Sequence, residues 1–97
     1  MNKSKNTLKI LIFIVAYNAQ HHIEKVLNRI PQSIFNYNYE ILIIDDSSTD
    51  ETFKIGKKYQ FNNRHLNLKI LYNPDNQGYG GNQKLGYYYS IINNFDL

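Results

Sequence analysis

The sequence has 97 residues, with 11 lysines and arginines against 8 acidic residues. A chain of this length forms one small domain at most. It contains no cysteine, which excludes disulfide frameworks, thiolate zinc sites and cysteine nucleophiles. Apolar residues make up 42% of the chain, so the composition is globular and excludes general disorder.

The net charge of +3 comes from the first ten residues, where Lys3, Lys5 and Lys9 have no acidic neighbour. A short basic segment of this kind is more typical of a solvated terminus than of an arm that binds nucleic acid or anionic lipid. We therefore expect residues 1–7 to form a flexible basic N-terminus, and we predict no nucleic-acid partner. The longest apolar run, residues 10–17, is too short for a membrane span of about 20 residues. No secretory cleavage site follows it, so we expect a cytoplasmic chain.

The first half of the chain predicts two strands and two helices. Residues 8–15 are almost uniformly apolar and rich in β-branched side chains, which is typical of a strand covered on both faces. Ile23, Val26, Leu27 and Ile30 follow at helical spacing and predict a helix over residues 20–30, which Pro31 ends.

A second apolar strand is predicted over residues 40–44. Ser48 and Glu51 have the spacing of a capping box and predict a helix over residues 50–60, with Phe53 and Ile55 in the core.

The second half continues the alternation. Residues 66–72 predict a third strand, and the following residues, 73–78, are dense in turn formers. A third helix is predicted over residues 82–93. Its inward-facing side chains are expected to be Leu85, Tyr88, Tyr89 and Ile92. Residues 95–97 resemble the start of a fourth strand.

Strands that alternate with helices predict an α/β fold with a Rossmann-like parallel sheet and right-handed crossovers. Ligands bind to such sheets beyond the carboxyl ends of the strands. Three predicted loops lie there, at residues 16–19, 45–50 and 73–81, so we expect them to form one shared site.

Each loop has a functional and a structural interpretation. Asp45 and Asp46 offer carboxylates that accept hydrogen bonds from a base or ribose, or that hold a divalent cation. They are equally suited to capping the next helix. An aromatic ring at Tyr17 can stack on a nucleobase or pack at the rim, while Asn18 can fix the turn or cap a helix.

The third loop contains a glycine cluster at residues 78–81. Glycines allow the backbone to approach a phosphate at a helix N-terminus, or they simply serve a mobile connection. Lys84 lies one turn further and can contact a diphosphate or remain an ordinary surface lysine. The His21–His22 doublet lacks the i, i+4 spacing of a metal pair, which favours solvated histidines.

The segments IVAYN (14–18), EILIIDDSSTD (40–50) and NPDNQGYGGNQKLGY (73–87) occur in this order. Together they resemble the N-terminal half of a family 2 glycosyltransferase with the GT-A fold, especially the branch similar to dolichol-phosphate-mannose synthase. The resemblance spans residues 8–97. It implies a partial sugar-nucleotide-binding domain and a role in cell-envelope polysaccharide biosynthesis.

The resemblance also implies roles for individual residues. Val15, Ala16 and Tyr17 would line the base of a UDP- or GDP-type sugar nucleotide. Asp46 would accept a hydrogen bond from the base, and Asp45 would shape the same loop. In the third segment, Gly78 and Gly80 would let the chain pass close to the nucleotide, and Lys84 would assist with phosphate.

The sequence departs from the family pattern at the first loop, which usually reads Pro-Ala-Tyr-Asn-Glu. Val15 replaces the proline and Ala19 replaces the glutamate, which removes one carboxylate from the ribose or base contact. The Asp-x-Asp motif that holds Mg²⁺ or Mn²⁺ in the family is expected beyond Leu97. Because a metal and a general base each contribute strongly to such a transfer, we expect the 97-residue chain alone to be inactive.

For the complete enzyme, the resemblance implies a lipid phosphate or glycan as acceptor and a location at the cytoplasmic face of the membrane. An uncovered sheet also predicts self-association. The main alternative is a non-catalytic remnant or interaction fragment that keeps only the fold. A dinucleotide-binding oxidoreductase is disfavoured because the first loop has no glycine. A receiver-like domain is disfavoured because the acidic doublet follows the second strand.

Overall fold

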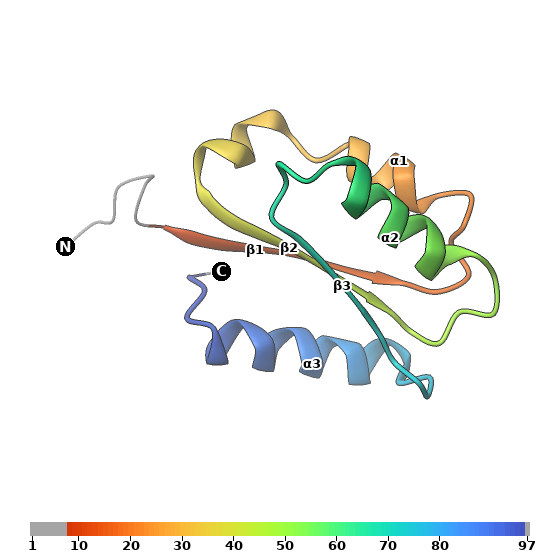
Figure 1. The fold of residues 1–97 in the computed structure, drawn as a ribbon. Coiled ribbons are helices and arrows are strands. Elements are labelled where there is room, and N and C mark those ends of the chain that lie inside the picture. The colour runs from red at the N-terminus through yellow and green to blue at the C-terminus, as the bar shows by residue number, and fades with distance from the viewer. Residues whose placement is uncertain (1–7, 97) are drawn as a thin grey trace.

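The computed structural model describes residues 8–96 and has three layers (Figure 1). A parallel sheet lies between two helices on one face and one helix on the other. Its strands are β1 (Lys9–Ala16), β2 (Asn38–Asp45) and β3 (Leu68–Tyr72), in the order β1-β2-β3. The predicted parallel α/β architecture is therefore confirmed. The expectation for residues 1–7 lies outside the described residues.

Three α-helices alternate with the strands; two connect them and the third follows β3, and the first two differ in length or position from the predicted helices. They are α1 (Ile23–Asn28), α2 (Thr52–Asn62) and α3 (Gly78–Ile92). A short 3₁₀-helix, η1 (Gln32–Asn36), follows the proline that ends the first helical region. Residues 20–22 form a turn before α1, because His22 and Ile23 both donate their N–H to the carbonyl of Ala19.

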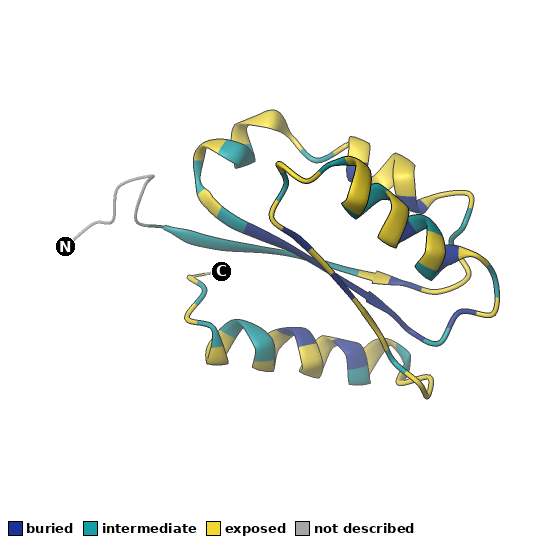
Figure 2. Cartoon of the chain, in the orientation of Figure 1, coloured by how far each residue is buried: buried dark blue, intermediate teal, exposed yellow. Residues whose placement is uncertain are grey.

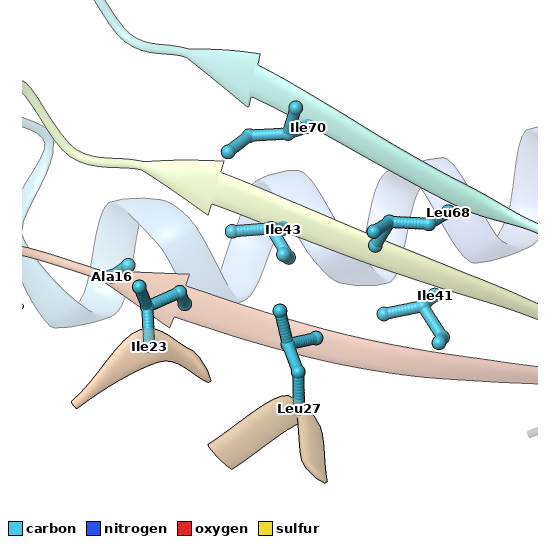
Figure 3. Packing of buried hydrophobic residues seen from close by; sticks show 7 residues of the cluster. All are labelled: Ala16, Ile23, Leu27, Ile41, Ile43, Leu68 and Ile70. Atoms are coloured by element: carbon cyan, nitrogen blue, oxygen red, sulfur yellow. The ribbon is translucent and has the colours of Figure 1, made fainter. Parts of the chain in front are cut away.

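The core lies between the sheet and the layer formed by α1 and α2. Figure 3 shows Ile23 and Leu27 of α1 packed against the strands. Strand β2 is central and is buried from Glu40 to its end, which Figure 2 shows as a continuous dark band. Successive side chains alternate between faces, so Ile41 and Ile43 point into this core while Leu42 and Ile44 point toward α3. The buried core residues are Ala16, Ile23, Leu27, Ile41, Ile43, Leu68 and Ile70.

The helical stripe predicted for α1 is partly wrong. Ile23 and Leu27 are buried and Ile30 packs against the core, but Val26 is 41% exposed. The helix is only 6 residues long, so it buries fewer apolar side chains than the predicted helix over residues 20–30 would. The core contacts predicted for Phe53 and Ile55 are confirmed.

The capping box predicted before α2 is also wrong. The hydroxyl of Ser48 accepts a hydrogen bond from the backbone of Asn18 instead of serving its own helix. The N–H of Thr52 bonds to the carboxylate of Asp50 at 2.9 Å, and the Thr52 hydroxyl donates to the same carboxylate. The loop before α2 therefore directs its polar groups to the neighbouring loop and to its own turn.

Helix α3 begins at Gly78, four residues earlier than predicted, so the glycine cluster belongs to its first turn. Asn82 and Gly86 are the buried residues of this helix. The expected inward side chains are mostly wrong as core residues, since Leu85, Tyr88 and Ile92 are 41%, 65% and 56% exposed. They nevertheless face the sheet as predicted, because they line an apolar cavity of about 360 Å³ together with residues of β2 and β3.

The segment after α3 returns to the start of β1. The N–H of Asp96 donates to the carbonyl of Lys9 at 2.7 Å, and the ring of Phe95 stacks against Tyr89. Residues 95 and 96 form no strand, but they lie where a fourth strand would begin to pair with the outer edge of β1. No helix within residues 8–96 is long and apolar enough to cross a membrane.

Candidate functional site

The three loops that follow the strands converge at one edge of the sheet. The N–H of Asp46 bonds to the carbonyl of Ala16, and the N–H of Asn73 bonds to the carbonyl of Asp45, both at 2.8 Å. A cavity of about 700 Å³ opens here on the α3 side of the sheet. It is lined by Phe13, Val15, Tyr17, Asp46, Asn76, Gly78, Tyr79, Asn82 and Gln83.

Hydrogen bonds between the first two loops hold the rim of this cavity. The backbone N–H groups of Asn18 and Ala19 donate to the hydroxyls of Ser48 and Thr52, each at 2.8 Å. Asn18 has a φ of 47°, a left-handed conformation that asparagine tolerates better than most residues. The fixed turn leaves the side chain of Tyr17 55% exposed beside the cavity.

The carboxylate of Asp46 is the most heavily hydrogen-bonded group of the site. Its Oδ1 accepts from the Nδ2 of Asn73 at 3.0 Å and from the N–H of Gln77 at 2.7 Å. Its Oδ2 accepts from the N–H of Gly78 at 3.0 Å. Asp46 therefore caps α3 from the end of β2, a long-range version of the usual N-cap. This cap explains why α3 begins before its predicted start.

Burial and hydrogen bonding act on Asp46 in opposite directions. Burial favours the neutral acid and by itself raises the pKa of this carboxyl, whose side chain is almost inaccessible. The bonds from Gln77, Asn73, Gly78 and Asn82 favour the ionised form and together outweigh burial, so the pKa lies below its ordinary value of 3.8. The group is thus a carboxylate at neutral pH.

Two amides, the half-buried Asn73 and the fully buried Asn82, complete a closed ring of hydrogen bonds around this carboxylate. Asn73 donates from Nδ2 to both Asp46 and the Oδ1 of Asn82. Asn82, which is fully buried, donates in turn to the carbonyl of Gly78 at 2.7 Å, and Gly78 donates back to Asp46. The ring joins the ends of β2 and β3 to the first turn of α3 and fixes the orientation of the carboxylate.

Asp45 and Ala16 lie on the opposite side of the sheet and do not line the cavity. Ala16 packs in the core with α1. Asp45 is fully buried, and its Oδ1 accepts the N–H of Ser48, so it shapes the turn after β2. Its Oδ2 has no hydrogen-bond partner within the described part of the chain. Alternation of side chains along the strand separates the doublet into one pocket residue and one turn residue.

The glycines and Lys84 are divided between two adjoining cavities. Gly78 lines the first and has a φ of 70°, a conformation that only glycine adopts readily. Gly80 and Lys84 line a second cavity of about 650 Å³, which shares Phe13 and Gln83 with the first. A Cβ atom at Gly80 would meet nothing within 4 Å, so the space beside it is open.

The structure adds five residues to the cavity that the sequence analysis did not single out. Phe13 lies two residues before Val15 in β1 and therefore on the same face, which the predicted strand already implied. Asn76 lies within the predicted third loop. The other three belong to the first two turns of α3, and only Tyr79 precedes the predicted start of that helix. They are Tyr79, Asn82 and Gln83.

The acidic doublet does not fit a divalent cation. Asp45 and Asp46 point to opposite faces, and both oxygens of Asp46 already accept N–H donors. Among residues 8–96, no three carboxylate or histidine side chains lie close enough together to hold a metal ion. The cation alternative for this doublet is therefore not supported by its geometry.

The molecule is thus a Rossmann-like α/β domain with a cavity at the carboxyl ends of its parallel strands. The sequence profile described as Glycosyl transferase family 2 matches residues 11–90, so the chain belongs to this family. Enzymes of this family generally use a divalent metal.

Three relatives illustrate the range of similar proteins. The chain is 33% identical over 98 residues to the uncharacterized glycosyltransferase MG060 of Mycoplasma genitalium, covering 93% of this chain and 33% of that protein. It is 32% identical over 72 residues to the poly(ribitol-phosphate) beta-N-acetylglucosaminyltransferase TarS of Staphylococcus aureus, covering 73% and 12%. It is 31% identical over 88 residues to a dolichyl-phosphate beta-glucosyltransferase of Dictyostelium discoideum, covering 84% and 27%. The chain therefore spans a third or less of the length of these relatives.

Proposed function

We propose that this chain is the donor-binding half of a glycosyltransferase that moves a sugar from a nucleoside diphosphate to an acceptor. The observation that carries the proposal is the cavity at the strand ends, where an exposed aromatic side chain, Tyr17, and an ionised carboxylate, Asp46, line one space. A nucleoside needs both elements, an apolar or aromatic surface for its base and a polar group for the base edge. Membership of glycosyltransferase family 2 supports the assignment.

The residues divide the donor between the two cavities. In the first, the base would lie against Val15 and Tyr17, with its edge toward Asp46. Gly80 and Lys84 border the adjoining space, where the ammonium group of Lys84 supplies positive charge for a diphosphate. Ala16 and Asp45 contribute indirectly, because they set the end of β1 and the turn after β2.

Transfer itself requires groups beyond this cavity. The described residues offer no cluster suited to Mg²⁺ or Mn²⁺, so we place the metal that neutralises the leaving diphosphate on another part of such an enzyme. TarS acts on poly(ribitol-phosphate) and the Dictyostelium relative on dolichyl phosphate, according to their names. We propose a lipid phosphate or a glycan as acceptor, which would place the complete enzyme at the cytoplasmic face of the membrane.

Binding of nucleoside diphosphates to the 97-residue chain tests the proposal. Isothermal titration with UDP and with GDP should show binding of at least one of them. The variant Tyr17→Ala should weaken that binding about 5- to 150-fold, because stacking on an aromatic ring contributes about 1–3 kcal/mol per base. The matched control is Tyr88→Ala, which removes another exposed tyrosine that lines a different cavity.

Two results would contradict the proposal. One is the absence of binding for both nucleotides to a chain that circular dichroism shows to be folded. The other is an equal effect of Tyr17→Ala and Tyr88→Ala. Either result would favour a fragment that keeps the fold without the donor site.

The unpaired edge of the sheet favours association of the chain with a second copy of itself. The outer edge of β1 has no strand partner within the described residues, and the apolar Phe13 and Leu11 line the cavity beside it. Unpaired edges of this kind pair with other chains. We therefore propose that two copies of the chain associate along β1, which sedimentation velocity would detect as a concentration-dependent dimer. A monomer at every concentration would contradict this part of the proposal.

A further inference from the structure

The outer side of α2 carries a group of cations that the donor cavity does not use. Four exposed side chains follow at positions i, i+3, i+4 and i+7 and therefore share one side of this helix. They are Lys54, Lys57, Lys58 and Phe61. Arg64 lies in the turn after the helix, and its guanidinium group stacks over the ring of Phe61, 4.4 Å from the ring centroid. We call these five residues the α2 patch.

The positive charge of the α2 patch is largely unbalanced. Residues 52–74 contain no aspartate or glutamate. Within residues 8–96, only Lys54 of the patch forms an ion pair, with the carboxylate of Glu51 at 3.6 Å, and both side chains are highly exposed. The last turn of α2 contains no basic residue, so the lysines do not serve to stabilise the carboxyl end of their own helix. The patch can therefore attract an anionic partner.

An exposed aromatic ring lies among these cations. Phe61 is 64% exposed, although phenylalanine is among the residues most often buried. A hollow of about 530 Å³ lies beside its ring and is lined by Lys57, Lys58, Gln60, Phe61 and Arg64. Cations next to an apolar ring match the interface of a bilayer, where lipid phosphates lie beside the acyl chains.

We propose that the α2 patch docks on a membrane surface that contains anionic lipids, with Phe61 between the headgroups and the cations against lipid phosphates. This inference rests on the membrane location given under the proposed function, and it is independent of the donor cavity. Figure 1 shows α2 and α3 on opposite faces of the sheet, and the cavity opens on the α3 side. A membrane seated on α2 would leave the cavity accessible to nucleotides from solution.

A nucleic acid fits this surface less well. Single-stranded nucleic acids bind in grooves that follow their backbone, whereas the α2 patch lies on the convex surface of one helix. Without the three lysines of the first ten residues, the 11 basic residues become 8, equal to the 8 acidic residues. The body of the chain therefore has no excess of positive charge that could follow a long polyanion.

Co-sedimentation of the 97-residue chain with lipid vesicles tests the inference. The vesicles contain phosphatidylglycerol and phosphatidylcholine in equal amounts, and vesicles of phosphatidylcholine alone should bind the chain more weakly. A basic side chain near an anionic membrane strengthens binding about five-fold. Lys58→Gln should therefore weaken binding to the anionic vesicles about five-fold. Lys84→Gln is the matched control, because it removes the same charge from an exposed position of α3, on the other face of the sheet, and should change binding less than about two-fold.

A second variant tests the aromatic ring. Phe61→Ala should weaken binding to the anionic vesicles about ten-fold, because the ring would lose an apolar environment. Its effect should persist at high salt, whereas the effect of Lys58→Gln should shrink because salt screens charge. Lys3 and Lys5 lie outside the described residues and stay unchanged in every variant, so they do not affect these comparisons.

Four results would each overturn the inference. They are the absence of binding to anionic vesicles, equal effects of Lys58→Gln and Lys84→Gln, unchanged binding of Phe61→Ala, and tighter binding of a single-stranded RNA than of anionic vesicles. None of them affects the donor-site proposal, which is tested separately by the titrations with UDP and GDP. Conversely, a chain that binds vesicles through the α2 patch but binds neither nucleotide would retain this inference and lose the donor site.

Discussion

Replacement of Asp46 by asparagine is the sharpest test of how the site is built. The carboxylate accepts three hydrogen bonds, from Asn73, Gln77 and Gly78. Asparagine keeps one oxygen, which can still accept from Asn73 and Gln77. Its amide nitrogen would then face the N–H of Gly78, donor against donor.

The expected cost follows from these contacts. One hydrogen bond to a charged group is lost, which is worth about 1.5–3 kcal/mol, and the other two become weaker neutral bonds. We expect Asp46→Asn to lower the free energy of unfolding by about 2–4 kcal/mol. A domain of this size has a total stability of about 5–15 kcal/mol, so the variant should still fold.

Urea unfolding at neutral pH, followed by far-ultraviolet circular dichroism, measures this loss. Small domains have a denaturant dependence of about 1 kcal/mol per molar urea, so the midpoint should fall by about 2 M or more. Asp75→Asn is the control, because it makes the same chemical change at an exposed position of the neighbouring loop. Its effect should stay within about 0.5 kcal/mol.

The pH dependence provides a second readout of the same variant. The pKa of Asp46 is lowered in the folded chain, so its contribution to stability is present above the ordinary value of 3.8 and is lost as the pH falls through the folded-state pKa. The difference between the natural chain and Asp46→Asn should therefore shrink in acid. Equal urea midpoints for Asp46→Asn and Asp75→Asn at neutral pH would refute the capping role.

Three further substitutions test the packing of α3, each by thermal or urea unfolding. Asn82→Ala should cost about 1–3 kcal/mol by opening the buried amide ring, and a change below about 0.5 kcal/mol would contradict this. Gly86→Ala should destabilise the chain by about 1–3 kcal/mol although alanine has the better helix propensity, because the new Cβ would lie 2.4 Å from the ring of Phe13. A more stable variant would show that the ring moves away at little cost. Tyr89→Phe removes the hydroxyl that donates to the buried Glu40 and should cost about 1–3 kcal/mol, whereas unchanged stability would mean that the remaining partners suffice.

The sequence alone determined the strand–helix alternation and the edge of the sheet where the site lies. These follow from local patterns, because apolar β-branched runs form buried strands and parallel crossovers bring the carboxyl ends of strands together. Val15, Tyr17, Asp46 and Gly78 were all placed at one site, and the structure brings them into a single cavity.

Only the tertiary structure shows which contact each polar side chain of the loops makes. The sequence shows Asp45 and Asp46 as an equivalent pair, but the end of β2 turns one toward the core side and the other toward α3. It shows Ser48 as a helix cap, but a loop 30 residues away in sequence takes its hydroxyl. Such hydrogen bonds join segments that are distant in the chain, and their partners become known only when the sheet sets those segments side by side.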